Sequence, residues 1–586
     1  MNQKSIIECC KELGCCDACC LRFLGLKSPA AYENPKQYVI NALGKQGASV
    51  SPALDKQVET VPASDQTEPA ATPPGAVSDP PHAASEPSPA PNEPSPAPTE
   101  LSPATSEPTP DVSEPSPAAS EPTPGASEPP DDANEPPNKK MKVDCVCTTC
   151  LGLLQQENWP QCNAMVKTML DKKRYECETF ACALSAPVAA LLRERVVALR
   201  LRDACANYDD GALTPLKEAW KWSFGAQLAR HVGLALDSGA VSPLLVTLHM
   251  EYLEEAGELE ALRRVAPELF ARRSASQRFA VEFTRRAVEQ ALAGASLAAL
   301  RAAGYAAPAA ASRAVCAAVS AQHAPLYLGG RYVKLSRTLP QTPWLVNGRR
   351  MLHSSVQELI CAPIAALYRL DAEDAEHRLK FMSAGREDVD VRCLGDGRPF
   401  AIEITDPTRQ PSEAELQQLC AQISSGGQVL VRRLVPVSRE HLALLKKGEE
   451  TKCKTYEALC IKLSHAADEQ LPAAAPVRVT ERDLQRVNAY SNCAGARVLL
   501  QQRTPIRVLH RRPLHVRPRR ILALSAHAVP AQPQLLLLRL RTDAGLYVKE
   551  WAHGELGRTR PALADALQAR VDILALDVAE VDLAWP

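Results

Sequence analysis

The sequence predicts an α+β protein, in which an α/β part precedes a larger part built on a largely antiparallel mixed sheet. Three observations support this class. Residues 188–202 carry apolar side chains at helical spacing. Residues 399–405 alternate apolar and polar side chains, which is the period of a half-buried strand. Residues 534–541 and 546–551 are two apolar runs on either side of Asp543-Ala-Gly545, a turn sequence typical of a β-hairpin.

Length and composition narrow the architecture. A chain of 586 residues predicts two or three domains at roughly 100–200 residues each. Hydrophobic residues make up 45% but aromatic residues only 4%, so we expect aliphatic cores. No apolar run reaches the ~18 residues of a membrane span, and residues 1–14 lack the apolar stretch of a secretory signal. We therefore expect no membrane partner, and a reducing compartment in which the 20 cysteines are thiols or metal ligands.

The N-terminal region divides into a Cys-rich head, residues 1–57, and a linker, residues 58–143. Between residues 61 and 137 the chain holds 14 Asp and Glu, 23 of its 49 prolines, and no Lys, Arg or aromatic residue. Such a segment cannot bury enough apolar area to offset chain entropy, so we expect a disordered Pro-rich insertion. Its repeated Ser-Glu-Pro strings favour an inert spacer; a Ser/Thr-Pro phosphorylation target is the alternative.

The remaining elements fall into two regions. In residues 144–322 we expect helices at 188–202, 216–222 and 283–302 and a buried strand at 314–320, an α/β domain with an appended helical part. In residues 323–586 we expect strands at 399–405 and 428–437, the hairpin of residues 534–551, and helices at 354–367 and 413–424 between strands.

Two pairs of cysteines have the spacing of a metal site. Cys16 and Cys19 form one C-x-x-C pair, and Cys147 and Cys150 form a second. Four thiolates close a structural tetrahedral Zn²⁺ site, with Zn–S bonds of about 2.3 Å. A long intervening linker adds little to the entropy of closing that site. A redox role for either pair alone is the alternative, and the absence of a nearby His argues against a catalytic zinc.

A basic strip lies late in the chain. Residues 501–520 contain seven Arg, two His and no acidic residue. Pro513 and Pro518 prevent a regular helix there, so we expect a strand or loop that faces a polyanion. Arg507, Arg511, Arg512 and Arg517 are its candidate RNA-binding residues. The alternative is a solvated basic face.

Several common catalytic motifs are absent from the sequence. It contains no G-x-x-x-x-G-K-[ST], no G-x-S-x-G and no H-E-x-x-H, and Gly395-Asp-Gly397 lacks the third glycine of a dinucleotide turn. We therefore expect chemistry without a nucleotide, an organic cofactor or a catalytic metal.

The strip from Ser383 to Gly395 packs acids and bases between glycines, and Gly385-Arg-Glu-Asp388 within it resembles the nucleophile loop of pseudouridine synthases. The longer string up to Arg392 resembles that of the archaeal and eukaryotic tRNA pseudouridine-54/55 synthases. Further strings are similar to the same family: Ser336-Arg-Thr-Leu-Pro-Gln-Thr-Pro-Trp344, Lys454-Thr-Tyr456, Arg507-Val-Leu-His-Arg-Arg-Pro513, Tyr547-Val-Lys-Glu550 and His553-Gly-Glu-Leu-Gly-Arg-Thr559.

The resemblance implies a C-terminal pseudouridine synthase fold in residues 323–586. In residues 144–322 it implies a THUMP-containing RNA-binding domain that completes the zinc site. It implies isomerisation of uridine at position 55 of tRNA, with position 54 left open. Asp388 matches the family's nucleophile. Tyr456, Tyr547, Lys549 and Leu576 match substrate-binding residues, with Tyr456 stacking on the base and Lys549 as the basic partner of Asp388.

Other interpretations remain open. Asp390 lies two residues from Asp388, but the Gly-Arg-x-Asp spacing favours Asp388. Glu387 and Asp390 are expected to be structural acids paired with arginines. A catalysis-independent RNA-processing factor on the same fold is the alternative function, and the missing glycine-rich loop disfavours a THUMP-linked methyltransferase.

The partner that we expect is tRNA, with other structured RNA left open, and the chain is expected to be a monomer. Lys139, Lys140 and Lys142 resemble a nuclear import signal. We expect the nucleus and cytoplasm as its location, with the mitochondrion left open.

Overall fold

The structure is a computed structural model. It describes residues 3–44, 145–205, 208–237, 239, 242–270, 283–305, 312–451, 453–472, 474–492 and 498–586. The expected Pro-rich insertion and the Lys139 cluster lie outside these residues, as does the end of the Cys-rich head.

The larger of the two hydrophobic cores of the N-terminal part draws on residues from both sides of the undescribed segment. Residues 3–44 form α1 (Gln3–Glu12), α2 (Asp17–Phe23), α3 (Pro29–Glu33) and α4 (Pro35–Gly44). Ile7, Leu21 and Phe23 from these helices are buried in the same cluster as Val166 and Phe180. Residues 3–44 of the head are therefore part of the α/β fold, because they share that core.

A four-stranded sheet lies at the centre of this part, in the order β2-β1-β3-β4. Its strands are β1 (Thr179–Ser185), β2 (Ala235–Leu236), β3 (Leu244–Glu251) and β4 (Val315–His323). Strand β1 pairs in parallel with β2 and β3, and β3 pairs antiparallel with β4. The α/β prediction is confirmed. The strand expected at residues 314–320 is β4, but it is only half-buried, since Val315 is 52% exposed whereas Val319 and Ala321 are buried.

The helices of the N-terminal part match two of the three expectations. They are α5 (Trp159–Lys173), α6 (Ala189–Ala204), α7 (Leu216–Trp220), which continues as a π turn η3 (Lys221–Gly225), α8 (Ala226–Val232), α9 (Glu255–Val265), α10 (Pro267–Phe270), α11 (Arg285–Gly294) and α12 (Leu297–Ala302), with short 3-10 turns η1 (Gln156–Asn158) and η2 (Asp210–Ala212). The single helix expected at 283–302 is wrong. Ala295 is extended, and the Ser296 hydroxyl accepts from the Ala299 N–H at 3.1 Å, which starts α12 as a separate helix.

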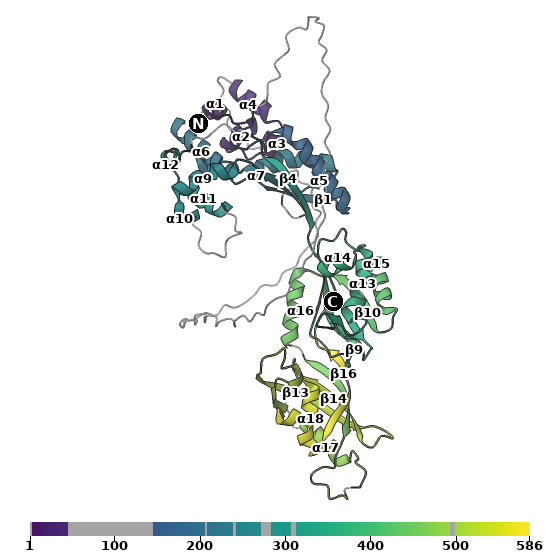
Figure 1. The fold of residues 1–586 in the computed structure, drawn as a ribbon. Coiled ribbons are helices and arrows are strands. Elements are labelled where there is room, and N and C mark those ends of the chain that lie inside the picture. The colour runs from purple at the N-terminus through teal and green to yellow at the C-terminus, as the bar shows by residue number, and fades with distance from the viewer. Residues whose placement is uncertain are drawn as a thin grey trace, which may run out of the picture. The chain divides into compact units, whose positions relative to one another are not determined.

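The C-terminal part is built on a ten-stranded sheet whose path is β10-β5-β9-β16-β11-β14-β13-β12-β15, with β8 paired to β9 (Figure 1). The strands are β5 (Leu326–Lys334), β8 (Leu379–Ser383), β9 (Arg392–Ile404), β10 (Val429–Pro436), β11 (Lys454–Lys462), β12 (Val498–Arg503), β13 (Val516–Ala528), β14 (Leu535–Thr542), β15 (Thr559–Arg560) and β16 (Val571–Val581); β6 (Leu345–Val346) and β7 (Arg349–Arg350) form a separate small hairpin.

The pairing within this sheet is antiparallel at every contact except one. That contact is between β16 and β9, where Asp577 and Val578 pair in parallel with Arg392 and Cys393. The prediction of a largely antiparallel α+β sheet is confirmed. The parallel contact divides the sheet into a β5-β9-β10 half and a β11-β16 half, and each half has its own hydrophobic core. We call this contact the seam.

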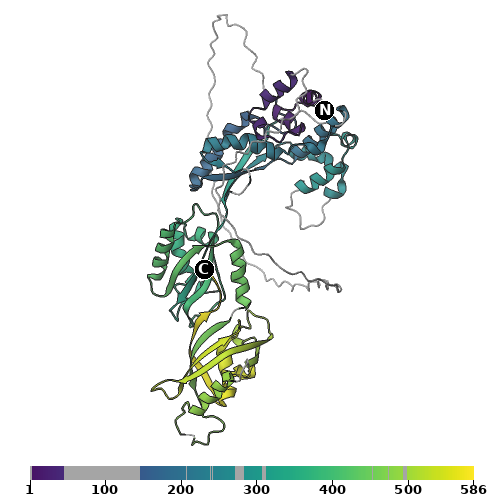
Figure 2. The same cartoon turned by 180° about the vertical axis from the view of Figure 1, so that it is seen from behind.

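Helices cover both faces of the β5-β9-β10 half. Phe400 and Ile402 of β9 pack with α13 (Val356–Leu367) and α15 (Glu413–Ser424). Ala401, which points the other way, packs with Leu442 and Leu445 of α16 (Arg439–Thr451). Figures 1 and 2 show α16 on the side of the sheet opposite to α13 and α15. A short helix, α14 (Ala372–Arg378), precedes β8.

The other half carries α17 (Glu481–Asn492), α18 (Val548–His553), α19 (Leu563–Leu567) and two 3-10 turns, η5 (Ile506–Val508) and η6 (Glu555–Gly557). The expected second hairpin strand at 546–551 is wrong, because this segment is α18. Val548, Trp551 and Ala552 are buried at the i, i+3, i+4 spacing of a helix. Strand β14 pairs instead with β11 and β13.

Four of the other C-terminal expectations are confirmed: β9 contains 399–404, β10 spans 429–436, and α13 and α15 stand where helices were expected. In the described part of the chain, no helix has the length and apolar character needed to span a membrane.

Candidate active site

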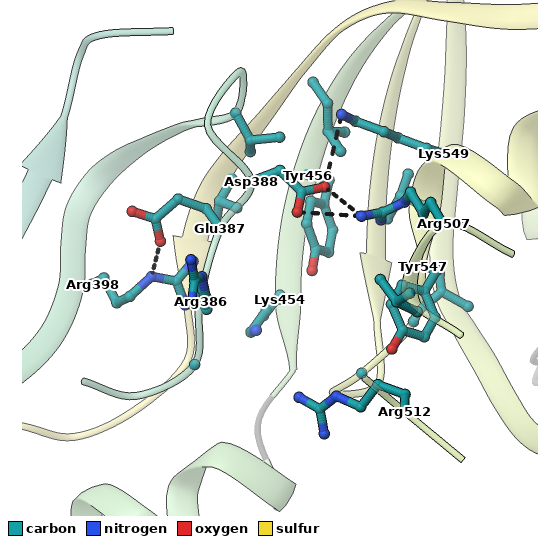
Figure 3. Close-up of a pocket in the computed structure, with 18 of the residues that line it drawn as sticks. Arg386, Glu387, Asp388, Arg398, Lys454, Tyr456, Arg507, Arg512, Tyr547 and Lys549 are labelled. Atoms are coloured by element: carbon teal, nitrogen blue, oxygen red, sulfur yellow. Dashed lines mark hydrogen bonds and ion pairs between the residues drawn. The ribbon is translucent and has the colours of Figure 1, made fainter. Parts of the chain in front are cut away.

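A pocket of about 270 Å³ opens where the two halves of the C-terminal sheet meet. Its walls come from the loop before β9, from β11 and β16, from α18 and from residues 507–512. The structure brings eight sequence-predicted residues together here: Asp388, Tyr456, Arg507, Arg511, Arg512, Tyr547, Lys549 and Leu576. Figure 3 shows several of them pointing into the pocket from both sides. Arg517 lies on β13 and does not line it.

The loop of residues 384–391 carries the candidate nucleophile, and its second residue is a glycine in a backbone conformation that other residues rarely adopt. Gly385 has a φ of +85°, and a Cβ there would lie 3.1 Å from Arg398 Nη1 and 3.2 Å from Lys454 Nζ. A side chain at this position would be strained and would crowd two cations. The first residue of the Gly-Arg-x-Asp string is therefore explained by backbone conformation and space.

The same loop is anchored by a buried ion pair. Arg398 Nε donates to Glu387 at 2.6 Å, and both side chains are at most 1% exposed. Tyr332 also donates its hydroxyl to Glu387 at 2.8 Å, and Arg398 Nη1 donates to the Ala384 carbonyl at 2.9 Å. The interpretation of Glu387 as a structural acid is confirmed. Burial, followed by the charge of Glu387, holds the pKa of Tyr332 well above its usual value.

Asp388 projects from this loop into the pocket, with its side chain 38% exposed. Its carboxylate lies 3.2 Å from Arg507 Nη1 and 3.8 Å from Lys549 Nζ. Arg507, which the sequence assigned only to RNA binding, is thus the closer of these two cations. Figure 3 shows both cations reaching Asp388 from the same side of the pocket.

Lys549 makes its shortest contacts with Asp390, at 2.7 and 2.9 Å. Burial opposes ionisation of Asp390, but the hydrogen bond and charge of Lys549 outweigh it and hold the pKa of this carboxyl below its usual value. The expected pairing of Asp390 with an arginine is therefore wrong. The reason is that α18 replaces the predicted strand and presents Lys549 to both Asp388 and Asp390.

Arg507 is itself held by neighbours that the sequence did not indicate. Its Nε donates to Glu550 at 2.6 Å, and its guanidinium lies 5.8 Å from the ring centre of Tyr547. Tyr547 is fixed through its main chain, since its N–H donates to Gln502 at 2.9 Å and its carbonyl accepts from Gln502 at 3.0 Å. Cation and ring are therefore both positioned before any ligand enters.

The floor of the pocket is apolar apart from one hydroxyl. Tyr456 of β11 is 8% exposed and stands opposite Val578 in the register with β16, and Leu576 stands opposite Ala458. Burial raises the pKa of Tyr456 to about 12, so its hydroxyl stays protonated at neutral pH. A flat ring beside apolar side chains is suited to stacking on a planar base.

The seam beneath the pocket is held by a shared carboxylate. Asp577 accepts from Arg392 at 2.5 and 3.0 Å and from Arg337 at 2.7 Å. Arg337 also donates to the carbonyls of Asp390 and Leu576, at 3.0 and 3.1 Å. Because these groups come from both halves of the sheet, they fix the loop of residues 384–391 relative to β16.

The strip of residues 501–520 is only partly a free basic surface. It contains the end of β12, the turn η5 and the start of β13, so the exclusion of a regular helix is confirmed. Arg520 pairs with Asp543 at 2.7 Å, and Arg507 pairs with Glu550 and Asp388. The strip itself contains no acidic residue, but acidic side chains from other elements, Asp543, Glu550 and Asp388, pair with its arginines in the folded chain.

The four cysteines of the two C-x-x-C pairs also come together, in the N-terminal part. The Sγ atoms of Cys16, Cys19, Cys147 and Cys150 all lie within 4.8 Å of one another. The Cys16 N–H donates to Cys147 Sγ at 3.2 Å, and Thr148 Oγ1 donates to the Leu13 carbonyl at 2.7 Å. The cluster is thus close enough to hold one metal ion, and its thiols suit a structural zinc.

A buried arginine that the sequence did not single out lies beside this cluster. Arg22 of α2 is 0% exposed, and its Nη1 lies 3.8 Å from Cys19 Sγ. It also pairs with Glu194 and donates to the Thr214 carbonyl at 2.9 Å. A cation at this position offsets part of the negative charge of thiolate ligands.

Both parts of the chain match the same family. Residues 147–322 match the description "Eukaryotic Pus10, N-terminal", and residues 327–582 match "Pus10, C-terminal". The tRNA pseudouridine synthase Pus10 of Xenopus laevis is 35% identical over 448 residues, which cover 75% of this chain and 81% of that protein. This chain belongs to the Pus10 family.

Some Pus10 relatives match a smaller share of the chain. The tRNA pseudouridine synthase Pus10 of Methanothrix thermoacetophila is 39% identical over 277 residues, which cover 45% of this chain and 55% of that protein. A chain in the crystal structure of a Cbf5–Nop10–Gar1 complex is similar at 13% identity and a TM-score of 0.21, over 43% of this chain and 58% of its own length.

The pocket and the cysteine cluster take residues from different Pus10 regions of this chain. All of the pocket lies in the C-terminal Pus10 region. The cysteine cluster takes Cys147 and Cys150 from the start of the N-terminal Pus10 region, and Cys16 and Cys19 from residues that precede it.

Proposed function

We propose that this chain is a tRNA pseudouridine synthase that acts on uridine 55 of the TΨC arm, with uridine 54 as a second target. The observation that carries the proposal is the position of Asp388. Its carboxylate stands half-exposed in the pocket, within 4 Å of two cations and beside the buried ring of Tyr456. The Pus10 relatives, which are named as tRNA pseudouridine synthases, support the same reaction.

The reaction is an isomerisation, so nothing outside the RNA needs to be consumed. The C1′–N1 bond breaks, the uracil turns, and C1′–C5 forms; the hydrogen at C5 is lost as a proton and N1 gains one. Asp388 acts as the nucleophile through its carboxylate, which Arg507 and Lys549 contact within 4 Å. Tyr456 stacks on the uracil, and Leu576 supports it from β16. Tyr547 and Lys549 contact the substrate at the mouth of the pocket.

The uridine must leave the tRNA loop to reach this pocket. Flipping a base out of its stack costs a few kcal/mol, which phosphate contacts elsewhere offset. Arg511 and Arg512 line the pocket mouth and supply such contacts together with Arg507, while Arg517 extends the basic track along β13. Phosphate contacts position the RNA without reading its sequence. Residues 144–322, as a THUMP-containing domain, recognise the tRNA by shape.

We also propose that the cysteine cluster holds one structural Zn²⁺. The donor set fits: four thiols converge, and three of them are fully buried. Four sulfur ligands leave no open position, so the ion supplies folding free energy and takes no part in the isomerisation. Bound metal would hold the head to residues 147–154.

Location and assembly complete the proposal. We propose that the protein acts as a monomer in the nucleus and cytoplasm. Fluorescence imaging of the tagged full chain, with and without Lys139, Lys140 and Lys142, tests the location. Light scattering in the presence and absence of tRNA tests the assembly state.

The decisive experiment incubates unmodified tRNA with the zinc-loaded full chain and no added cofactor. Release of tritium from 5-labelled uridine reports turnover, and carbodiimide labelling maps the product. We expect product at position 55 with the wild type and none with Asp388→Asn, which keeps size and loses the nucleophile. The matched control is Asp390→Asn, which also faces Lys549 and should retain turnover. An active Asp388→Asn variant beside an inactive Asp390→Asn variant would overturn the assignment of the nucleophile; binding of tRNA without turnover would leave the RNA-processing role instead.

A further inference from the structure

A fully buried lysine lies behind the nucleophile loop, and the reaction as described does not use it. Lys334 is the last residue of β5 and is 0% exposed. Its ammonium makes no ion pair among the described residues. Instead, Nζ donates to three main-chain carbonyls: Leu339 at 2.7 Å, Val389 at 2.9 Å and Asp388 at 3.0 Å.

This arrangement requires the charged form of the side chain. An ammonium carries three N–H donors, whereas a neutral amine carries two and a lone pair. Only the protonated side chain can therefore satisfy all three carbonyls. Burial lowers the pKa of Lys334 from its usual value, and the negative charges of Glu387 and Asp390 oppose this effect only in part. A buried charge is costly to keep unless each of its donors is paired, as they are here.

Lys334 differs from the other side chains around the loop of residues 384–391 in the main-chain carbonyls to which it donates. Arg398 holds Ala384, Gln341 holds Gly385, and Arg337 holds Asp390. Among the described residues, Lys334 is the one whose side chain donates a hydrogen bond to the main chain of Asp388 itself. The side chain of Asp388, by contrast, contacts Arg507 and Lys549 through its carboxylate oxygens.

We propose that Lys334 is a positioning residue of the active site: by holding the carbonyls of Asp388 and Val389 against Leu339, it aims the Asp388 carboxylate at the flipped uridine without touching the RNA. The inference rests on the proposed function. Lys334 lies on the side of the loop away from the pocket and is absent from its walls. Its effect should therefore fall on the chemical step and not on RNA affinity.

The test compares Lys334→Met, Lys334→Arg and a matched control, Lys462→Met. Lys462 is also 0% exposed and lies in the same sheet, but it pairs with Asp483 at 2.7 Å and Glu469 at 3.2 Å, away from the loop. Single-turnover rates at saturating tRNA, tRNA dissociation constants and thermal melting are measured for each variant, with rates corrected for the folded fraction.

For Lys334→Met we expect a rate loss of about 100-fold, the size that a 1 Å misplacement of a reacting group produces, with tRNA affinity within about twofold of wild type. Lys334→Arg keeps the charge and should recover at least about tenfold of that loss. Lys462→Met leaves the buried Asp483 unpaired, so it should melt at a lower temperature yet react at the wild-type rate per folded molecule.

The outcomes separate the two proposals. A wild type that binds tRNA but makes no pseudouridine would overturn both. An active wild type with an equally active Lys334→Met variant would overturn the role of Lys334 alone, as would equal rate losses in the two methionine variants. If Lys334→Met does not fold, Lys334→Arg decides: a slower rate at unchanged affinity supports the role, and the wild-type rate overturns it.

Discussion

At the scale of single residues, acidic and basic side chains alternate from the wall of the pocket to the residues next to it. Glu550 holds Arg507 at 2.6 Å, and Lys549 holds Asp390 at 2.7 Å. Asp388 lies between the two cations, with longer contacts to each, at 3.2 and 3.8 Å. The proposed nucleophile is thus the least tightly held of the three acids, which leaves its oxygens available to a substrate.

These distances rank the two cations in a testable way. Both Arg507→Met and Lys549→Met should slow single-turnover pseudouridine formation, because each removes a cation that contacts and orients the Asp388 carboxylate. We expect the larger loss, about 100-fold against about tenfold, for Arg507→Met, since its guanidinium is the closer. Rates at saturating tRNA check this order. Equal losses, or a larger loss for Lys549→Met, would contradict the ranking by distance.

At the scale of elements, the seam between β9 and β16 depends on Asp577. Its pKa is lowered overall, because the hydrogen bonds and charges of Arg392 and Arg337 outweigh the opposing effect of burial. A carboxyl with a lowered folded-state pKa contributes stability that is present above its unfolded pKa and is lost as the pH falls through the folded value.

Asp577→Asn should therefore reduce the free energy of unfolding by about 1–2 kcal/mol at pH 7, a modest value because both arginines are about a third exposed to solvent and screened. The difference from wild type should shrink below about pH 4 as the wild-type carboxyl takes up a proton. Urea unfolding at pH 7 and pH 3, followed through the C-terminal part, measures it. A difference that is the same at both pH values would contradict the ion-pair explanation.

The strip of residues 501–520 permits a second prediction at this scale. Arg511→Ala with Arg512→Ala should weaken tRNA binding and reduce the slope of log K against log salt by about 1–2, because each phosphate contact releases close to one counterion. The rate at saturating tRNA should be largely retained. Arg520→Ala is the control, because Arg520 already pairs with Asp543. Filter binding at several salt concentrations tests the pair; a slope equal to that of the control would remove the strip's assigned role.

Much of the fold could be predicted from the sequence where local pattern decides structure. Strand β9 forms where residues 399–405 predict a strand, although helices cover both of its faces and it is not half-buried, and α6, α13 and α15 follow their apolar spacing. The segment 546–551 was mistaken for a strand because six residues carry too few repeats to separate a period of 2 from one of 3.6. Its burial against β16 and α19 selects the helix α18.

Site residues that lie in sequence strings resembling a family could be predicted from the sequence. Residues whose role depends on their burial in the fold could not. Asp388, Tyr456 and Leu576 were found through their strings, and the structure brings them together. Lys334 and Arg22 were missed because a single Lys or Arg in a sequence is read as a solvated charge. Only tertiary packing shows that both are 0% exposed.

At the scale of the whole molecule, the cysteine cluster joins residues 16–19 to residues 147–150. Cys16→Ser with Cys19→Ser should abolish the binding of one Zn²⁺ per chain and destabilise the N-terminal part, since structural zinc contributes folding free energy on the order of 10 kcal/mol. Metal analysis and thermal melting check this. Cys177→Ser, outside the cluster, is the control. Full metal content in the double variant would exclude these ligands.

The shared core of the N-terminal part has a consequence for a broken chain. Ile7, Leu21 and Phe23 are packed with Val166 and Phe180, and the cysteine cluster draws two ligands from each side of residues 45–144. A protease cut at a single bond between residues 61 and 137 would divide the covalent chain but remove none of these contacts. The nicked protein should therefore migrate as one species under native conditions and as two on a denaturing gel. Its two fragments should separate most readily when a chelator is added, because the bound ion would otherwise link them in place of the cut peptide bond.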